Sequence, residues 1–325
     1  MVSGSTIITS EAKCVDLIPI KVEGKTRCAN YLGKNLCSLK SHFICEPSLQ
    51  NGSLNPIPVS YSQISTFANC PRKYFYQYIL RIRPLKVPSY YVQGRVFHAQ
   101  LADYYRTGKR REEIAVNDEN EVLGYAHADA YIEYYHDHRP GLLIETEHKG
   151  ELDGKIPFVA ILDLYDKAEG EIQDHKLSRS VSSFLITAFQ AYMYFEAQRD
   201  AKKFTLNVTL KSGLKRKGAE NLMDYYYRLR KDLTIKAGKT FRRITYHRSE
   251  IMDYYKREVN NIIAEINRRR VHPDDIGLFY MNPSACSMIE CEYQPICENL
   301  ALPKGLYKIE GANNDKKQHG EQCAR

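Results

Sequence analysis

The sequence predicts an α/β (α+β) fold in which a mixed central sheet is flanked by helices. Short segments with strand-like alternation are interspersed with segments whose apolar residues recur at helical spacing. The hydrophobic fraction is 43% and the charged fraction 26%, as in globular proteins. A length of 325 residues is enough for one large domain or two modest ones with a substantial core.

The composition divides the chain into three parts. Residues 1–58 are rich in Ser, Asn and Gly and are interpreted as an N-terminal extension with one weak strand signal at 16–22. Residues 59–300 carry the periodic segments and are expected to form the domain. Residues 301–325 are polar and charged, and are predicted to be a disordered tail from Ile309 onward.

Three helices are expected before the first strand of the domain. The first begins at Ser62, a favourable N-cap residue, and must kink or restart at Pro71 because proline lacks the N–H that a helix needs. The second helix covers about residues 91–106, with His98 near its apolar side. The third covers about residues 120–137.

The pattern then changes to mainly strand-like periods. Strands are predicted at 142–147, 156–164 and 171–176, and the last two flank a polar Lys-Ala-Glu-Gly turn that indicates a β-hairpin. The later elements are a helix at 183–198, strands at 204–210, 224–230 and 240–246, and a long amphipathic helix at 249–269.

The hairpin groups three charged side chains. Asp163 lies at the end of its first strand, and strand alternation places Asp174 and Lys176 on one face of the second. Grouped carboxylates need a counter-ion, and oxygen ligands suit Mg²⁺ or Mn²⁺, which commonly serve phosphoryl chemistry. His175 and Asp166 point to the opposite faces of their strands, so neither is assigned a catalytic role.

The charge distribution favours a polyanionic partner. The net charge is +8 and the isoelectric point is near 8.8. The chain has 25 Tyr and no Trp, so Tyr is the main residue on which single-stranded bases could stack. Any one basic cluster is more often an ordinary solvated surface. The clusters are at 72–73, 81–83, 109–111, 211–217, 228–231, 242–243 and 268–270.

No apolar run approaches the roughly 18 residues of a membrane helix. The first ten residues lack a signal-peptide layout, so no membrane is expected as a partner and the expected location is cytoplasmic, or the host cytoplasm for a viral protein. Nine cysteines in such a chain are expected to be thiols or metal ligands rather than disulfides. Three of them crowd near the C-terminus. Cys14, Cys28, Cys37 and Cys45 lack a close pair and are expected to be unligated, with a small zinc site as the alternative.

These residues, taken in order, resemble the RecB-like branch of the PD-(D/E)XK nucleases. The matching set is His98, Asp163, Asp174-x-Lys176 and Gln190-x3-Tyr194. The S-x-x-S…CPRKYFYQY segment at Ser62–Tyr78 is similar to the N-terminal helix of that branch. The C-x4-C-x5-C segment resembles the iron–sulfur end of AddB nuclease domains and of CRISPR-associated RecB-like exonucleases, although the first spacing is commonly x2.

The resemblance implies a restriction-endonuclease-like core with a metal site. Asp163 and Asp174 would hold Mg²⁺ or Mn²⁺, and His98 would be a further ligand. A backbone carbonyl and waters would complete the shell, because Mg²⁺ rarely has an all-protein cage. Glu145 or Glu147 on the preceding strand could also reach the metal, which is the less favoured alternative.

The resemblance also assigns roles to three residues beyond the metal ligands. Lys176 would orient or activate the attacking water and offset the charge that develops on the phosphorus centre. Gln190 and Tyr194, four apart on one helical face, would position the nucleic-acid backbone or support Lys176.

The cysteines Cys70, Cys286, Cys291 and Cys297 supply four thiolates. The resemblance favours a [4Fe–4S] cluster that joins the first and last helical elements of the domain, and a structural zinc ion is the alternative.

The function implied is that of a metal-dependent DNA exonuclease acting on single-stranded ends, with 5′ to 3′ cleavage favoured, in repair, recombination or viral genome processing. One alternative is a CRISPR-adaptation-type nuclease that trims spacer precursors. Another is a non-catalytic nucleic-acid-binding subunit that partners a helicase or recombination enzyme. The intact set of Asp163, Asp174 and Lys176 argues against the non-catalytic alternative.

Overall fold

The computed structural model describes residues 19–22, 25–28, 58–111, 113–153, 155–181, 184–272, 275–288, 291–299, 302–303 and 305–310. In the N-terminal part, β1 (Pro19–Val22) and β2 (Lys25–Cys28) form an antiparallel pair. The strand signal predicted at 16–22 is thus confirmed for residues 19–22. Cys14, Cys37 and Cys45 lie outside the described residues.

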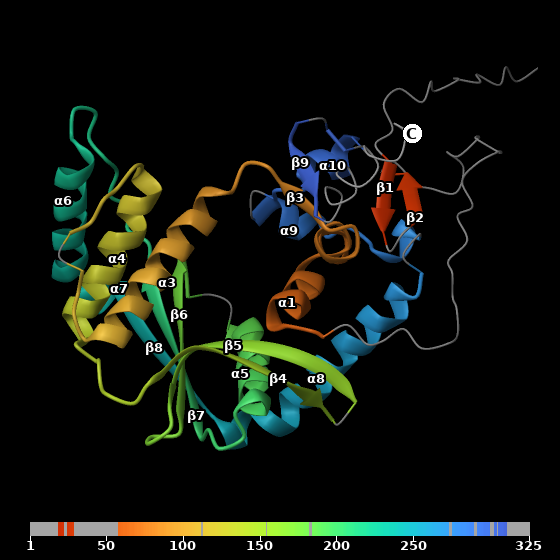
Figure 1. The fold of residues 1–325 in the computed structure, drawn as a ribbon, viewed down its shortest axis with the longest axis horizontal. Coiled ribbons are helices and arrows are strands. Elements are labelled where there is room, and N and C mark those ends of the chain that lie inside the picture. The colour runs from red at the N-terminus through yellow and green to blue at the C-terminus, as the bar shows by residue number, and fades with distance from the viewer. Residues whose placement is uncertain are drawn as a thin grey trace, which may run out of the picture.

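The domain is built on a five-stranded mixed sheet, which confirms the predicted fold class (Figure 1). The strands, in sheet order, are β4 (Leu143–Leu152), β5 (Ile156–Asp166), β6 (Glu171–Ser178), β7 (Lys203–Leu210) and β8 (Phe241–His247). Only β6 and β7 run parallel, and α5 (Phe184–Ala197) makes the crossover that parallel strands require. β5 and β6 form the predicted hairpin, with Gly170 at φ +61° in its turn.

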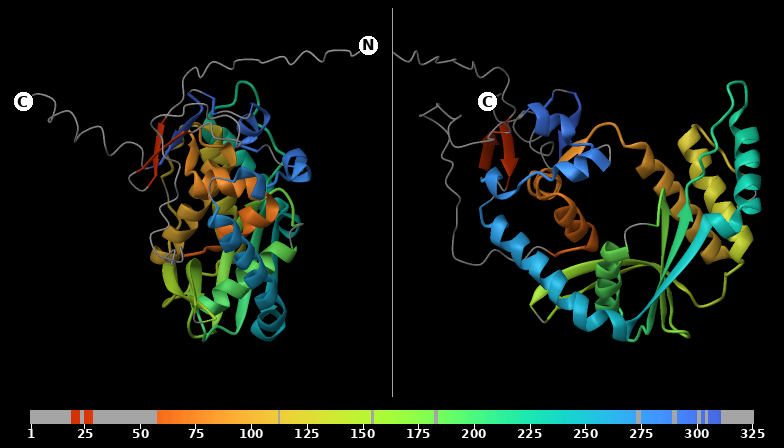
Figure 2. Two further views of the ribbon diagram at one scale, coloured as in Figure 1. Left: turned by 90° about the vertical axis from the view of Figure 1, so that its right-hand side faces the viewer. Right: turned by 180° about the vertical axis from the view of Figure 1, so that it is seen from behind.

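Helices cover both faces of this sheet (Figures 1 and 2). One core cluster packs the sheet against α3 (Ser89–Thr107), α4 (Glu119–Tyr135) and α6 (Leu222–Ile235). The other packs it against α5, α8 (Arg248–Arg270) and α1 (Tyr61–Asn69). The short α7 (Ala237–Thr240) leads into β8. None of the described helices combines the length and apolar character needed to cross a membrane.

The two ends of the domain meet in a third core cluster. The N-terminal side supplies α2 (Pro71–Tyr74), the π-helix η1 (Phe75–Ile79) and β3 (Ile82–Pro84). The C-terminal side supplies the 3₁₀ helix η2 (Ile276–Leu278), α10 (Gln294–Asn299) and β9 (Tyr307–Ile309). The short α9 (Pro283–Met288) lies between η2 and α10 in the chain. β3 pairs antiparallel with β9, so residues Tyr307–Ile309 of the predicted tail form a strand.

Hydrogen bonds join these ends directly. The buried Arg72 donates to the carbonyl oxygens of Phe279 at 2.6 Å and Ile276 at 3.3 Å. The Tyr293 hydroxyl donates to the Ile82 carbonyl oxygen at 2.9 Å. Partners more than 200 positions apart in sequence are therefore held by backbone carbonyls as well as by apolar packing.

The N-cap of the first helix lies two residues earlier than predicted. Ser60, not Ser62, is the N-cap: its side chain accepts a hydrogen bond from the Gln63 backbone N–H, and α1 begins at Tyr61. The predicted break is confirmed, because α1 ends at Asn69 and α2 begins at Pro71.

The prediction of a strand at 224–230 is wrong, because these residues form part of the helix α6. Three consecutive tyrosines favoured a strand by propensity, but the buried positions Tyr225, Tyr226, Leu229 and Leu233 follow helical spacing. Asn221 caps the helix, since its side chain accepts from the Asp224 backbone N–H at 2.8 Å. Tertiary packing against α4 decides the outcome over intrinsic propensity.

Two glycines test the packing of α3 against α4. A Cβ atom on Gly124 would lie 2.6 Å from Val96 Cβ, whereas a Cβ on Gly94 would meet nothing within 4 Å. Gly124→Ala should therefore destabilise the domain by about 1–3 kcal/mol. Gly94→Ala should be neutral or stabilise it by up to about 1 kcal/mol, because alanine is the better helix former. Urea unfolding measures both, and equal effects would contradict this packing.

Candidate active site

Asp163 lies where β5 and β6 stop pairing. Their ladder ends at Leu164 opposite Gln173, and beyond it the His175 backbone N–H donates to Asp163 Oδ2 at 2.8 Å. The Asp163 carboxylate thus accepts the hydrogen bond that a backbone carbonyl of β5 would accept if the strands were still paired. On the other side, Glu145 has a φ of +49° and is left out of the pairing between β4 and β5. Such irregular backbone is typical of functional sites.

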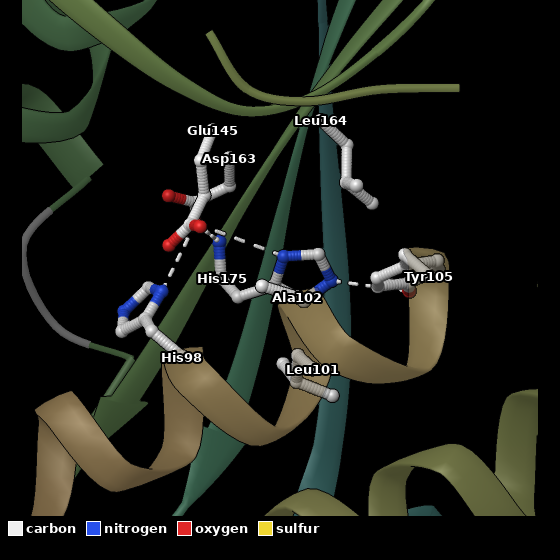
Figure 3. A pocket seen from close by; sticks show the side chains of 8 residues that line it. All are labelled: His98, Leu101, Ala102, Tyr105, Glu145, Asp163, Leu164 and His175. Carbon is white, nitrogen blue, oxygen red and sulfur yellow. Dashed lines mark hydrogen bonds and ion pairs between the residues drawn. The ribbon is translucent and has the colours of Figure 1, made fainter. Parts of the chain in front are cut away.

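Two histidines flank the Asp163 carboxylate (Figure 3). His98 Nδ1 on α3 lies 3.3 Å from Asp163 Oδ2, and His175 Nδ1 lies 3.7 Å from the same atom. Burial alone would raise the pKa of Asp163, but the His175 hydrogen bond and His98 hold it well below its usual range. Burial would lower the pKa of His98, and Asp163 reverses this so that the His98 pKa is raised. Asp163 is therefore a stable carboxylate anion.

A small pocket opens at this group (Figure 3). Its volume of about 10 Å³ is near the least that one water molecule needs. The lining residues are His98, Leu101, Ala102, Tyr105, Glu145, Asp163, Leu164 and His175.

Asp174 forms the centre of a second group on the neighbouring strand. Its side chain is almost fully buried, and Lys176 Nζ lies 2.8 Å from Asp174 Oδ2. On α5, Gln190 Nε2 donates to Asp174 Oδ1 at 2.7 Å and the Tyr194 hydroxyl donates to it at 3.1 Å. Gln190 and Tyr194, one helical turn apart, therefore both hydrogen-bond to Asp174 rather than to Lys176. Neither side chain is exposed for contact with a nucleic acid.

Burial and charge act in opposite directions on this pair. Burial raises the pKa of Asp174, and the nearby Lys176 only partly offsets that rise. For Lys176, burial alone would lower the pKa, but Asp174 and Asp163 outweigh it and the pKa is raised. The two aspartates therefore have pKa values pushed in opposite directions, as is typical of catalytic carboxylates.

The structure does not gather the three predicted metal ligands into one cluster. Over the part of the chain that it describes, no three His, Cys, Asp or Glu side chains are arranged to hold a metal ion. His98 and Asp163 face each other, while Asp174 faces Lys176. Each carboxylate has a different basic side chain as its neighbour, which separates the two groups.

The donor chemistry nevertheless fits a divalent cation. The Asp174 carboxylate is buried, with Oδ1 held by Gln190 and Tyr194 and with Oδ2 lying 2.8 Å from Lys176 Nζ. Together with the anionic Asp163, it supplies the oxygen ligands that Mg²⁺ or Mn²⁺ prefers.

His175 contacts the site, although no role was predicted for it from the sequence. Strand alternation does turn its side chain away from Asp174, but its backbone N–H and ring both approach Asp163. Strand alternation predicts where side chains point but not which groups the backbone N–H contacts. No sequence pattern could therefore have indicated this contact. The ring Nε2 also lies 3.2 Å from the Tyr131 hydroxyl and 3.4 Å from that of Tyr105.

These tyrosines continue into a buried polar network. The Tyr105 hydroxyl donates to Asp137 Oδ1 at 2.8 Å, and Arg243 on β8 donates to the Tyr131 hydroxyl at 3.1 Å. Arg243 is also paired with Asp137. The His175 ring is therefore fixed by partners from α3, α4 and β7, the last being Asn207 at 3.4 Å.

The other candidate carboxylates have partners of their own. Glu145 lines the pocket but pairs with Arg106, and Glu147 lies 2.7 Å from Lys149 on the same strand. Asp166, which the sequence placed on the opposite face, pairs with Arg139 at 2.6 Å.

Tyr61, which the sequence did not single out as a site residue, interacts electrostatically with Lys176 and Asp174. Burial raises its pKa to about 12, partly opposed by Lys176.

Several basic clusters that suggested nucleic-acid contacts are used inside the fold. Arg72 is buried, and Lys73 pairs with Glu292 at 3.0 Å. The other internal pairs include Arg228 with Glu220, Arg230 with Glu133, Arg243 with Asp137 and Arg269 with Glu265. These clusters are consistent with the ordinary structural interpretation rather than with a continuous basic surface.

The four cysteines singled out by the sequence are free thiols near one another. Cys297 interacts electrostatically with Cys291 and Cys70, and Cys291 with Cys286. Burial raises the pKa of Cys297 to about 11. The described thiols are not in metal-binding geometry, although sulfur donors suit iron–sulfur or zinc in chemical type.

Two tyrosines on α5 test the support of Asp174. Tyr194→Phe should lower the free energy of unfolding by about 1–2 kcal/mol, because Asp174 loses a buried donor. Tyr192→Phe is the matched control. The Tyr192 hydroxyl is buried without a partner among the described residues, so its removal should change stability by less than about 0.5 kcal/mol. Denaturant unfolding measures both, and an equal loss in both variants would count against the Asp174 contact.

The chain was compared with known proteins. Among solved structures, a candidate exonuclease from Eubacterium rectale is 14% identical, with 79% of this chain and 93% of that chain covered and a TM-score of 0.45. A phage-related exonuclease from Haemophilus somnus 129PT is 13% identical, with 73% and 98% covered and a TM-score of 0.31. The curated proteins contain no match. Residues 58–298 match the PD-(D/E)XK nuclease superfamily, so the chain belongs to that superfamily of nucleases.

Proposed function

We propose that this protein is a Mg²⁺- or Mn²⁺-dependent deoxyribonuclease that hydrolyses phosphodiester bonds at single-stranded DNA ends. One observation carries the proposal: the buried Asp174 pairs with Lys176 at 2.8 Å, next to the anionic Asp163 on the adjoining strand. Superfamily membership supports nuclease chemistry at these residues.

Asp163 and Asp174 would hold the cation through their carboxylate oxygens, with His98 as the proposed third ligand. When bound, the cation would polarise the scissile phosphate and make a coordinated water more acidic.

Lys176 acts as a charged group in this proposal. Its pKa is raised, so at neutral pH it is an ammonium ion and cannot accept a proton from water. Its side chain is 41% exposed, which lets it reach the substrate. We assign it the orientation of the attacking water and the stabilisation of negative charge on the phosphoryl oxygens.

Gln190 and Tyr194 are positioning residues. Both are buried, and both donate to Asp174 Oδ1, which leaves Oδ2 directed away from them. Side chains that donate hydrogen bonds to a ligating carboxylate fix its orientation. His175 fixes Asp163 in the same way through its backbone N–H.

The finer parts of the proposal rest on the resemblance to the RecB-like branch. They are the action on single-stranded ends, the 5′ to 3′ direction, and a place in repair, recombination or viral genome processing. The net charge of +8 supports a polyanionic substrate.

We further infer that Cys70, Cys286, Cys291 and Cys297 hold a [4Fe–4S] cluster, with zinc as the alternative. The support is that Cys297 interacts electrostatically with Cys291 and with Cys70 from the other end of the domain, and Cys291 with Cys286. The raised pKa of Cys297 means that the free thiol is neutral at pH 7, so ligation would release its proton.

A cleavage assay tests the active site. On an end-labelled single-stranded oligonucleotide with Mg²⁺ or Mn²⁺, Asp174→Asn and Lys176→Met should each lower the rate by about 100-fold or more, because each removes charge that acts on the transferring phosphate. A circular single strand should resist the wild-type enzyme if cleavage begins at ends.

Glu151→Gln is the control for that assay. It also removes a carboxylate from the sheet, but Glu151 is exposed on β4 and is expected to leave the rate within about twofold of wild type. Wild-type rates in both site variants would refute the assignment.

The cysteine proposal predicts a broad visible absorption band in anaerobically purified protein, which zinc cannot give. Cys291→Ala should remove the band and lower thermal stability, because the ligands join residues over 200 positions apart. A colourless wild type containing stoichiometric zinc would overturn the iron–sulfur assignment.

A further inference from the structure

A second pocket lies where α1, the π-helix η1, the start of β3 and the end of α8 meet. Its volume is about 300 Å³, against about 10 Å³ for the pocket at Asp163. This is at the lower end of the range for small-molecule sites. The lining residues are Gln63, Gln77, Tyr78, Arg81, Arg83, Arg270 and Glu310.

The charge in this pocket favours an anion. Three guanidinium groups face one carboxylate. Arg83 pairs with Glu310 at 3.1 Å and also donates to the Gln77 carbonyl oxygen at 2.9 Å. Arg270 donates to the neutral Gln63 Oε1 at 2.8 Å. Neither Arg270 nor Arg81 has a described carboxylate within ion-pair distance, so two positive charges remain for a ligand.

Two polar atoms here are buried without partners. Arg270 Nε and Gln77 Oε1 have no hydrogen-bond partner among the described residues. Arg270 Nε can only donate a hydrogen bond. A phosphate oxygen would accept that bond and would also neutralise the unpaired positive charge of the arginines. Buried unsatisfied groups of this kind are few in native proteins and indicate a partner that binds there.

The backbone that builds the pocket is irregular at two adjacent places. Gln77 and Tyr78 lie on the π-helix Phe75–Ile79, a form that is rare and often found at functional sites. Arg81, just beyond it, has a φ of +53°, which is strained for a residue with a Cβ atom. The Glu310 backbone N–H donates to the Arg81 carbonyl oxygen at 3.0 Å and helps to hold this conformation.

An aromatic ring adds a second kind of contact. Tyr78 is half-buried in the lining and packs against Tyr74, with ring centroids 5.1 Å apart. Arginine together with tyrosine is the usual combination that binds the phosphate and the base of a nucleotide. The volume leaves room for more than a phosphate group alone.

We propose that this pocket binds the phosphate of a nucleotide unit, at a site separate from the active site. The first turn of α1 connects the two sites, because Tyr61 interacts with Lys176 and Asp174 while Gln63 lines the pocket. The nucleotide is either part of the bound strand or the free mononucleotide product. This inference rests on the proposed function only in taking the phosphate to come from nucleic acid.

Binding measurements in EDTA test the pocket without any cleavage. The probes are dAMP, followed by calorimetry, and a fluorescent 5′-phosphorylated single-stranded oligodeoxynucleotide, followed by anisotropy. Arg81→Gln should weaken at least one probe by about tenfold, since it removes a charge-assisted contact to phosphate. Arg257→Gln is the matched control, because Arg257 is exposed on α8 and outside the pocket. It should change binding by less than about twofold.

Glu310→Gln provides a test of the opposite sign. Glu310 is the one carboxylate among the described lining residues. Its removal should tighten binding of the same probe by about two- to fivefold, which a folding defect could not produce. If these variants change the affinity for dAMP, the pocket is a mononucleotide site. If they change only the affinity for the oligonucleotide, the pocket binds part of the strand. Equal affinities in Arg81→Gln and Arg257→Gln, or no gain in Glu310→Gln, would overturn the proposal.

The two proposals fail in different ways. If the active-site assignment is wrong, Lys176→Met retains wild-type cleavage with Mg²⁺ while the EDTA binding differences persist. If the pocket proposal is wrong, cleavage is lost in Lys176→Met while Arg81→Gln binds both probes like Arg257→Gln.

Discussion

Like charge on two neighbouring strands is the constraint around which the domain is arranged. Asp163 and Asp174 lie where β5 and β6 separate, Asp174 fully buried and Asp163 partly so, and such carboxylates are unfavourable unless each is compensated. The compensation comes from elements on both faces of the sheet: His98 from α3, and Gln190 with Tyr194 from α5. Lys176 supplies the remaining charge from the same strand as Asp174. The helices that cover the sheet therefore also supply the side chains that compensate the negative charge of the two aspartates.

The two ends of the domain are held together by other interactions. They meet through aromatic packing, through Arg72 bonded to distant carbonyl oxygens, and through the β3–β9 pair. A cluster on the four cysteines would add to an arrangement that already has its own hydrogen bonds. The same meeting of chain ends creates the arginine-lined pocket, since its residues come from α1, η1 and α8 together with residues just before and after the short strands. Its ligand would thus bind at the junction that closes the domain.

The sequence predicted the hairpin and the facing of Asp174 and Lys176, because strand alternation has a fixed period of two. It predicted Gln190 with Tyr194 through family resemblance, but not that both serve Asp174. Two errors have physical causes. The run of tyrosines in α6 follows packing rather than propensity, and the His175 backbone N–H lies outside any side-chain pattern. Basic clusters were also ambiguous, because partners such as Glu292 for Lys73 lie 219 positions away.

The central claim is that Asp163 and Asp174 together bind a divalent cation. The most direct test is a titration of Mn²⁺ followed by electron paramagnetic resonance, in which protein-bound Mn²⁺ disappears from the free-ion signal. Wild type should bind Mn²⁺, and Asp163→Asn and Asp174→Asn should each weaken that binding by about tenfold or more, as expected for loss of a charged oxygen ligand. Glu151→Gln should bind as wild type does. Unchanged Mn²⁺ affinity in both aspartate variants would contradict the account.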